Sequence, residues 1–364
     1  MLPCVSLAKP MLRSCGQGDG RIVRRDPVHR LAVTLVVLWT VCCSGVWQVE
    51  AASEALTPPY GPLRLVNQQP VQLLFLQQFP DAADVTPPGH LDVHLNMALT
   101  NTLVEEKDNF SATLDLEMVR SVLDLHYGVH AHLEVGLDIP LMYTYGGILD
   151  HFISGVESTL TGHRRPLRRR QVAGEFTYQV SRGKRLFIQG QDDAVGIGDV
   201  VLKAKASLLH EQALLPAVSL RAAVKFPSGD SARAFGSGEV DGGFGFLIQK
   251  TLWRLTFYVN GDVTFPGQAF KDVGVSLQPF FGGVMAIEFR LSDPVSCVVQ
   301  LRGDTRPFHH TIPILDKRLI QSILGVNWAI TRHLVLQAGV DEDQFNSACC
   351  SADVSFFLNL TGRL

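Results

Sequence analysis

Hydrophobic and polar residues alternate with a period of two along most of the chain after residue 90. In the segment 91–99, for example, Leu91 and Val93 alternate with Asp92 and His94. This period is typical of a β-strand whose two faces meet different surroundings. The alternating segments run for about 9 to 15 residues, whereas strands of soluble proteins are usually about five or six residues long. Strands of this length can cross a lipid bilayer when they are tilted.

The two registers of these segments differ in charge. One register has no charged residues, and the other carries Asp, Glu, Lys or Arg on nearly every segment. In a transmembrane barrel the uncharged face meets lipid and the polar face lines the lumen. We therefore expect a set of charged side chains to line a lumen and to set its selectivity. These residues are Lys203, Lys205, Arg221, Lys225, Asp262, Glu288 and Arg290.

Short and long connections alternate along the chain, as they do in barrels with tight periplasmic turns and extended outer loops. Residues 292–294 make a short connection, and residues 146–170 and 228–239 make long ones. The pattern predicts an all-β fold, namely a transmembrane antiparallel up-and-down β-barrel of about fourteen strands. The segments at 171–180 and 185–189 have the weakest alternation, and without them the barrel has twelve strands.

Aromatic residues fall near both ends of the predicted strands. Those near the short turns are Tyr127, Trp253, Phe289 and Trp328. Those near the long loops are Tyr143, Phe226, Phe244 and Phe265. Two aromatic girdles at the membrane interfaces are typical of transmembrane barrels. Alternatively, any one of these aromatic residues is an ordinary strand residue that does not belong to a girdle.

The first 51 residues have the pattern of a secretory signal peptide. Arginines precede the apolar run Leu31–Cys43, and small residues at Val49 and Ala51 suit a signal peptidase. We expect export with cleavage near Ala51, and Met11 is an alternative start. Residues 52–89 are rich in proline and contain the apolar run Val71–Phe79. This segment is predicted to be a plug or a tether for the barrel of residues 90–364.

Composition narrows the classes of function. The chain has 46% hydrophobic residues and a net charge of -3, so neither a disordered protein nor a nucleic-acid partner is indicated. After removal of the signal peptide only Cys297, Cys349 and Cys350 remain, which is too few for a disulfide framework. No cofactor and no metal site is predicted. The spacing of His126 and His132 does not ensure that their side chains converge, as the ligands of a metal ion must.

Two clusters in the predicted outer loops are candidates for a functional role. A row of arginines stands at the end of the longest loop, where guanidinium groups suit the phosphates of lipopolysaccharide. These are Arg164, Arg165, Arg168, Arg169 and Arg170. The alternative is a solvated basic loop. Asp341 and Asp343 are the acidic residues that a barrel enzyme would use, but no Ser, His and acid arrangement converges with them. We therefore predict that the protein is not an enzyme.

Several short motifs resemble an uncharacterised family of proteobacterial exported proteins that are presumed to form outer-membrane barrels. The motifs include Tyr127-Gly128, Gly196-Ile197-Gly198-Asp199 and Lys225-Phe226-Pro227-Ser228-Gly229-Asp230, and the resemblance extends from about residue 61 to the end. It implies a bacterial outer-membrane location and assigns no activity. Chains of such barrels usually finish on an aromatic residue, whereas this one finishes on Leu364, so its recognition by the barrel-assembly machinery is less assured.

Together these observations predict a passive channel or uptake barrel for small solutes, with hydrophobic ones among the candidates. Its expected surroundings are outer-membrane lipid and lipopolysaccharide. Two other classes stay open, a barrel enzyme that acts on lipid or peptide and a closed structural or adhesive barrel.

Overall fold

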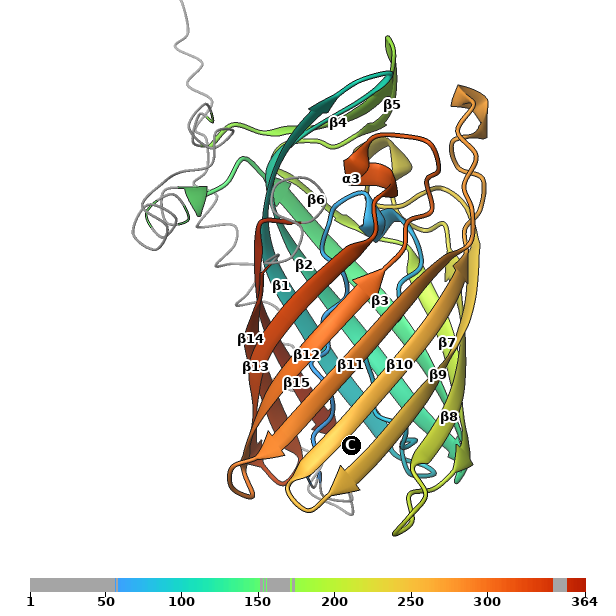
Figure 1. The fold of residues 1–364 in the computed structure, drawn as a ribbon, viewed down its shortest axis with the longest axis vertical. Helices are drawn as coiled ribbons and strands as arrows, with labels where there is room; N and C mark the ends of the chain where they lie inside the picture. The colour runs from blue at the N-terminus through green and yellow to red at the C-terminus, as the bar shows by residue number, and fades with distance from the viewer. Residues whose placement is uncertain are drawn as a thin grey trace, which may run out of the picture. The chain divides into compact units, whose positions relative to one another are not determined.

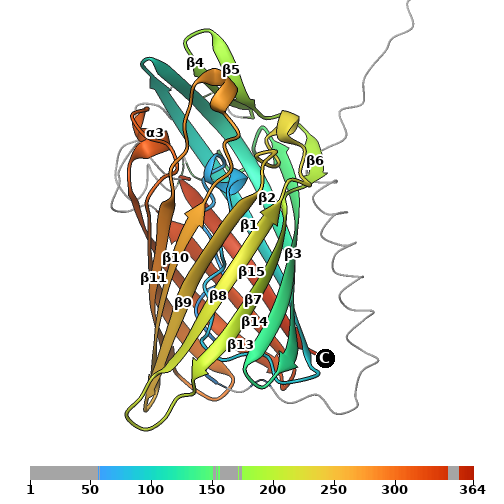
Figure 2. The ribbon, with the colours of Figure 1, turned by 90° about the vertical axis from the view of Figure 1, so that its right-hand side faces the viewer.

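The alternating segments form the strands of a closed antiparallel β-barrel in the computed structural model (Figures 1 and 2). The structure describes residues 58–150, 174–342 and 352–364, with Leu56, Ile153, Gly155 and Gln171. The predicted signal peptide and its cleavage site at Ala51 lie outside the described residues. Within those residues twelve strands close into a ring, because the first of them pairs with the last. The ring consists of β1 (Leu91–Lys107), β2 (Phe110–His130), β3 (Leu133–Tyr145), β7 (Val200–Leu209), β8 (Ala217–Phe226), β9 (Asp241–Leu252), β10 (Leu255–Phe265), β11 (Phe280–Arg290), β12 (Val295–Asp304), β13 (Leu319–Thr331), β14 (Leu334–Glu342) and β15 (Val354–Arg363).

The ring therefore has twelve strands, the smaller of the two numbers expected from the sequence, and not fourteen. Three further strands, β4 (Thr177–Arg182), β5 (Arg185–Gln189) and β6 (Ala194–Ile197), lie at the end of the barrel that carries the long loops. β4 pairs with the outer part of β2, and β5 pairs with β4, so the two form an arm beyond the barrel. They are shorter than the roughly nine residues that a tilted strand needs to cross a bilayer.

The two faces of the barrel wall differ as the alternation predicts. On β3, Leu133 and Val135 are exposed on the outside, whereas Glu134 and Asp138 are buried inside. Large apolar side chains also cover the outer face of the other strands. Examples are Leu202, Leu220, Phe244, Phe281, Met285, Ile287, Val299, Leu301, Leu324 and Val326. A continuous apolar surface of this extent is unusual for a protein in water, and it matches the lipid-facing band of a transmembrane barrel.

Short turns join the strands at one end of the barrel, which we call the inner end, and the long loops lie at the outer end. β15 returns the C-terminus to the inner end, where Arg363 pairs with Asp92 of β1 at 2.6 Å. One predicted girdle residue at the outer end is placed differently. Tyr143 is buried, and its hydroxyl donates to Asp193 at 3.0 Å, because the outer end of β3 is covered by β6 and its flanking chain.

Helices among the described residues are short. They include α3 (Pro313–Asp316) and the 3-10 turns η1 (Gln72–Leu74), η2 (Ser231–Arg233) and η3 (Lys271–Val273). None of the helices in this part of the chain is both long and apolar enough to span a membrane.

Residues 58–90 run through the inside of the barrel, and we call them the N-terminal hairpin (Figure 1). The hairpin enters at the inner end, where the Tyr60 hydroxyl donates to the carbonyl of Asp293 in a short turn at 2.5 Å. It rises to η1, which packs in an apolar cluster with the outer loops, and then descends to the start of β1. At the exit Gly89 donates to the carbonyl of Gly128 at 2.8 Å.

Candidate functional site

The N-terminal hairpin is held in the lumen by side chains of the barrel wall. Backbone N–H groups of the hairpin donate to these side chains over distances of 2.7 to 3.2 Å. The pairs are Gly61 with Glu288, Leu63 with Gln300, Arg64 with Gln337, Leu76 with Asp241, Asp81 with Asn260, Ala83 with Gln249 and Thr86 with Glu134. Buried backbone groups need such partners. Since the hairpin contributes no strand to the described sheet, the ladders of the barrel are complete without it.

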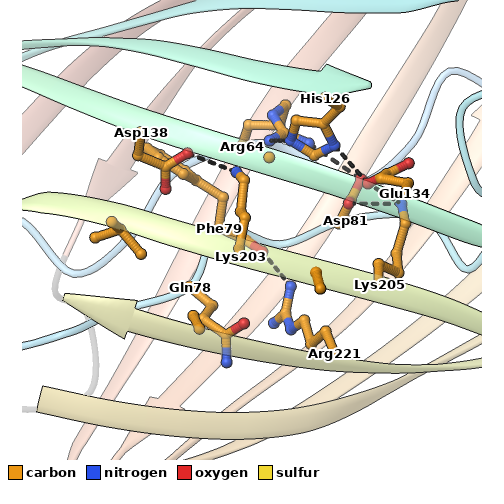
Figure 3. A pocket seen from close by; sticks show the side chains of 14 residues that line it. Arg64, Gln78, Phe79, Asp81, His126, Glu134, Asp138, Lys203, Lys205 and Arg221 are labelled. Atoms are coloured by element: carbon orange, nitrogen blue, oxygen red, sulfur yellow. Dashed lines mark hydrogen bonds and ion pairs between the residues drawn. The ribbon is translucent and has the colours of Figure 1, made fainter. Parts of the chain in front are cut away.

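A network of buried charged groups joins the hairpin to three neighbouring strands (Figure 3). Its members are Arg64 and Asp81 of the hairpin, Asp124 and His126 of β2, Glu134 and Asp138 of β3, and Lys203 and Lys205 of β7. Lys205 links the two sides, because its Nζ lies 2.9 Å from Asp81 and 3.2 Å from Glu134. Lys203 lies 2.6 Å from both Asp124 and Asp138 within the wall.

His126 occupies a position between two carboxylates. Its Nε2 lies 2.8 Å from Asp124, and its Nδ1 lies 2.6 Å from Glu134. Two acceptors facing both ring nitrogens suit an imidazolium that donates two hydrogen bonds. If the imidazolium of His126 is counted as a cation, the six wall groups of the network are three anions and three cations. The hairpin adds one cation, Arg64, and one anion, Asp81, which also contact each other at 3.1 Å.

Asp81, His126 and Glu134 offer ligand atoms that lie within 4.8 Å of one another, a spacing that a metal ion could bridge. The cations around them argue against that use. Arg64 and Lys205 already neutralise Asp81, and Lys205 also pairs with Glu134. A divalent ion would have to displace these groups or add two uncompensated charges to a buried site.

The sequence-predicted lumen residues divide by position. Lys203, Lys205, Arg221, Lys225, Asp262 and Glu288 lie inside the barrel with partners that the structure brings to them. Arg221 forms a bidentate pair with Asp262 at 2.8 and 2.6 Å and donates to the hairpin carbonyl of Phe79. Lys225 contacts Asp199 at 2.6 Å and the hairpin carbonyl of Leu74 at 2.9 Å.

Glu288 and Arg290 mark the inner end of the lumen. Glu288 is buried and accepts from the backbone of Tyr60 and Gly61 and from the Tyr258 hydroxyl. Arg290 is half-buried and lines a small recess with Pro58 and Pro59. Burial and the nearby charge of Glu288 raise the pKa of Tyr60, which keeps its hydroxyl a hydrogen-bond donor at this rim.

Two sizeable cavities lie on opposite sides of the network. The outer cavity, of about 360 Å³, is lined by the hairpin tip at Leu74 and by side chains of the arm and two outer loops. The inner vestibule, of about 310 Å³, lies between the two limbs of the hairpin and the wall near His94 and Arg363. Voids of only about 20 and 30 Å³ lie along the hairpin at the charged network and beside Phe75.

Apart from His126, the other sequence candidates lie away from this site or outside the described residues. The cluster Arg164, Arg165, Arg168, Arg169 and Arg170 lies outside the described residues, as does Asp343. Asp341 is buried and accepts from Gln321 at 2.8 Å. His126 and His132 separate, because His126 points into the lumen while His132 lies at the inner rim beside His210.

Several residues of the site were not predicted from the sequence. Asp124, Glu134 and Asp138 stand in the polar register of their strands, which was a signal that could have found them. Arg64 and Asp81 had no such signal, because the hairpin has no period and its partners come from distant strands.

Residues 34–364 match a family described as Protein of unknown function (DUF3187). This chain belongs to that family. The match agrees with the resemblance seen in the strand and turn motifs. No curated protein matches the DUF3187 chain significantly.

One solved outer-membrane channel shares the fold of this DUF3187 protein, and two other barrels match it with lower TM-scores. The COG4313 outer membrane channel from Pseudomonas putida F1 is 12% identical with a TM-score of 0.55, and the match covers 79% of this chain and 100% of that one. The P. putida toluene transporter TodX is 10% identical with a TM-score of 0.36, covering 82% and 91%. An active-site mutant of outer membrane phospholipase A from Escherichia coli is 9% identical with a TM-score of 0.35, covering 82% and 98%. The first likeness establishes the fold of an outer-membrane β-barrel.

Proposed function

We propose that this protein is an outer-membrane uptake barrel for small solutes, and that its lumen opens when the N-terminal hairpin moves. The observation that carries the proposal is that the hairpin fills the lumen without being part of the hydrogen-bonded sheet. A twelve-stranded barrel is too wide for its own side chains to fill, so either an internal segment or water occupies it. An internal segment bound through side chains can leave while the wall stays intact.

Charge balance supports a hairpin that moves. Arg64 and Asp81 carry opposite charges, so their departure removes one cation and one anion from the network. The six wall groups then remain in balance, with Lys203 still paired to Asp124 and Asp138. Departure of the hairpin would therefore leave the net charge at this level unchanged, with Arg120 of β2 as a further wall cation beside Asp138. The outer cavity and the inner vestibule would become one passage once the hairpin no longer separates them.

The proposed setting is the outer membrane of a Gram-negative bacterium, reached by export and by insertion through the barrel-assembly machinery. The apolar outer wall supports contact with membrane lipid, and the outer end would face lipopolysaccharide. The inner end, which carries the short turns and the C-terminus, would face the periplasm.

The rival enzyme function lacks support in the described residues. Asp341, an acidic residue that it would use, is buried against Gln321 of the neighbouring strand. The other rival function, a closed structural barrel, predicts that the hairpin never moves. A covalent bond that fixes the hairpin to the wall distinguishes this function from an uptake barrel.

The test is a disulfide that fastens the hairpin tip to the wall. Leu76 packs with Ala223 of β8 in one buried cluster, so Leu76→Cys with Ala223→Cys places two thiols at this contact. Cys297, Cys349 and Cys350 are replaced by serine, and thiol titration shows whether the disulfide has formed. The rate at which cells of a porin-deficient Gram-negative strain take up labelled naphthalene or arabinose is then measured with and without a reductant.

We expect uptake of at least one solute to fall to the level of cells without the protein when the disulfide is formed, and to recover after reduction. The Leu76→Cys variant alone controls for the substitution and is expected to ignore the reductant. Uptake that stays the same in the locked and reduced states would contradict a moving hairpin, and uptake equal to that of empty cells in both states would favour a closed structural barrel.

A further inference from the structure

The outer cavity combines apolar side chains with the polar groups of Arg185, Ser231, Ser237 and Asp272. Four separate segments supply its apolar lining: the hairpin tip, the strand β5, the loop with η2 and the loop with η3. The apolar lining residues are Leu74, Leu186, Phe187, Ile188, Ala234, Phe270 and Val273. Sites for small molecules are typically concave, mostly apolar and about 300 to 1,000 Å³ in volume, and this cavity of about 360 Å³ lies at the small end of that range.

Aromatic rings shape one side of the cavity. Phe187 and Phe270 meet edge to face with their centroids 5.2 Å apart, and Phe270 stacks on Phe308 at 6.0 Å. Phe75 of the hairpin meets Phe270 and Phe308 edge to face at 6.5 and 5.7 Å. Of these four rings, Phe187 and Phe270 line the cavity. They favour an aromatic guest, because aromatic pairs gain most from offset or edge-to-face contact.

The charged groups at the rim of the cavity already have partners. Arg185 of the arm pairs with Asp272 of η3 at 2.7 Å and donates to its carbonyl at 2.8 Å. Nearby, Arg182 donates to the carbonyls of Val273 and Gly274 at 2.9 and 2.8 Å. These contacts fasten the arm over the cavity, and a carboxylate would have to displace Asp272 or these carbonyls to reach either guanidinium group. A neutral guest is therefore favoured over a carboxylate or an ammonium ion.

From this geometry we infer that the outer cavity binds uncharged aromatic molecules of one or two rings. An apolar cavity of about 150 Å³ already accommodates benzene, so a cavity of this volume has room for two fused rings. The bound molecule rests on Leu74, at the tip of the hairpin that closes the lumen. This inference names a solute class for the proposed uptake function and relies on that function only for the later passage inward.

Binding is tested on the purified full-length protein in detergent by scintillation proximity with tritium-labelled naphthalene. Excess unlabelled naphthalene defines the saturable part and removes the contribution of the micelles. The variant Ala232→Trp places a bulky ring on a residue that lines the cavity and is exposed. Its matched control is Ala213→Trp, at an exposed alanine of an inner turn. Phe187→Ala removes one of the aromatic rings.

We expect saturable binding by the unmodified protein and by Ala213→Trp. Ala232→Trp and Phe187→Ala should each weaken it by about tenfold or more, the scale of discrimination in apolar pockets. Decanoate, an anionic acyl chain, should not compete. Heat-modifiable migration on gels shows which variants have folded, and two independent variants keep the test decisive if one does not.

Absence of saturable binding, equal binding by all folded variants, or displacement by decanoate would overturn the inference. Failure here is separate from failure of the proposed function. Saturable naphthalene binding without cellular uptake would leave the cavity assignment standing and reject uptake. Hairpin-dependent uptake of arabinose without naphthalene binding would do the reverse.

Discussion

Lys205 is a wall side chain that connects the hairpin directly to the barrel. It is buried, and its ammonium group contacts Asp81 at 2.9 Å, Glu134 at 3.2 Å and the carbonyl of Ala82 at 3.4 Å. Two of these partners belong to the hairpin and one to β3. Removing one member of a buried ion pair typically costs about 3 to 5 kcal/mol, because the remaining charge is left uncompensated. Docking of the hairpin should therefore depend on this lysine.

Trypsin cleavage at Arg64 reports on that docking. Arg64 is the single basic cleavage site in residues 58–90, and it is buried in the closed barrel. Lys205→Met should raise the rate of cleavage after Arg64 by about a hundredfold when cleavage follows the open population. Lys250→Met removes a partly exposed lysine that contacts an inner turn, and it should leave the rate unchanged. Equal rates for both variants would show that Lys205 does not hold the hairpin.

Gly128 marks the point where the hairpin leaves the lumen and joins β1. A Cβ at this residue would lie 2.1 Å from the carbonyl oxygen of Pro87 and 2.4 Å from that of Thr86. Both are backbone atoms and cannot rotate away. The local chain has to shift to accept any side chain larger than hydrogen.

Gly128→Ala should therefore destabilise the folded barrel by about 1 to 3 kcal/mol, the usual cost of overpacking. Gly242→Ala is the matched control, because a Cβ there meets nothing within 4 Å. Urea unfolding in detergent, followed by heat-modifiable migration, measures the difference. A control variant that loses as much stability as Gly128→Ala would refute the steric explanation.

The arm of β4 and β5 is an element that covers the outer cavity but lies beyond the ring of twelve strands. Its base pairs with the outer part of β2, and Arg182 joins it to the loop with η3. Arg185 also pairs with Asp272, and Tyr178, Val180 and Ile188 pack in the apolar cluster with the outer loops. Because the arm has only two short strands, it should still open more readily than the barrel.

Arg182→Ala should speed amide exchange in residues 177–189 by roughly tenfold, since hydrogen bonds to a charged group contribute about 1.5 to 3 kcal/mol before screening by solvent. Exchange in β10 to β14 should stay the same. Lys184→Ala, at an exposed residue in the turn between β4 and β5, is the control. Hydrogen exchange with mass spectrometry resolves these peptides. Unchanged exchange in the arm of Arg182→Ala would mean that packing alone holds it.

The strands of the ring were predictable because each one carries the same local rule, apolar outside and polar inside. On β8, Arg221 and Lys225 point inward, as their alternation with Leu220 and Val224 implies. The alternation is weakest in the segments that form β4 and β5, which left twelve and fourteen strands both open. Their exclusion from the ring depends on length and on the unusually long β2 that carries them.

The site was less predictable than the wall. Its polar half follows the strand register, but the hairpin that completes it has no repeating pattern, and its contacts join residues more than a hundred positions apart, as in Lys205 with Asp81. The outer cavity likewise forms from loop segments whose approach depends on closure of the whole ring. Neither arrangement can be predicted from local sequence patterns.

As a whole the molecule combines an apolar outer belt, a complete ring of strands and an interior segment that closes the lumen. The belt matches the lipid-facing surface of a membrane barrel, and the ladders of the ring are complete without the hairpin. In the function that we propose, the hairpin decides whether the barrel conducts. This division of roles is the central claim, and removal of the hairpin tests it.

The most direct measurement is ionic conductance in planar lipid bilayers, comparing the full-length protein with a variant that lacks residues 60–88. Heat-modifiable migration first establishes that the shortened chain still forms a barrel. The full-length protein should remain closed for most of the recording, whereas the shortened barrel should show a steady conductance. A full-length protein that conducts as well as the shortened one, or a folded shortened barrel that does not conduct, would contradict the account.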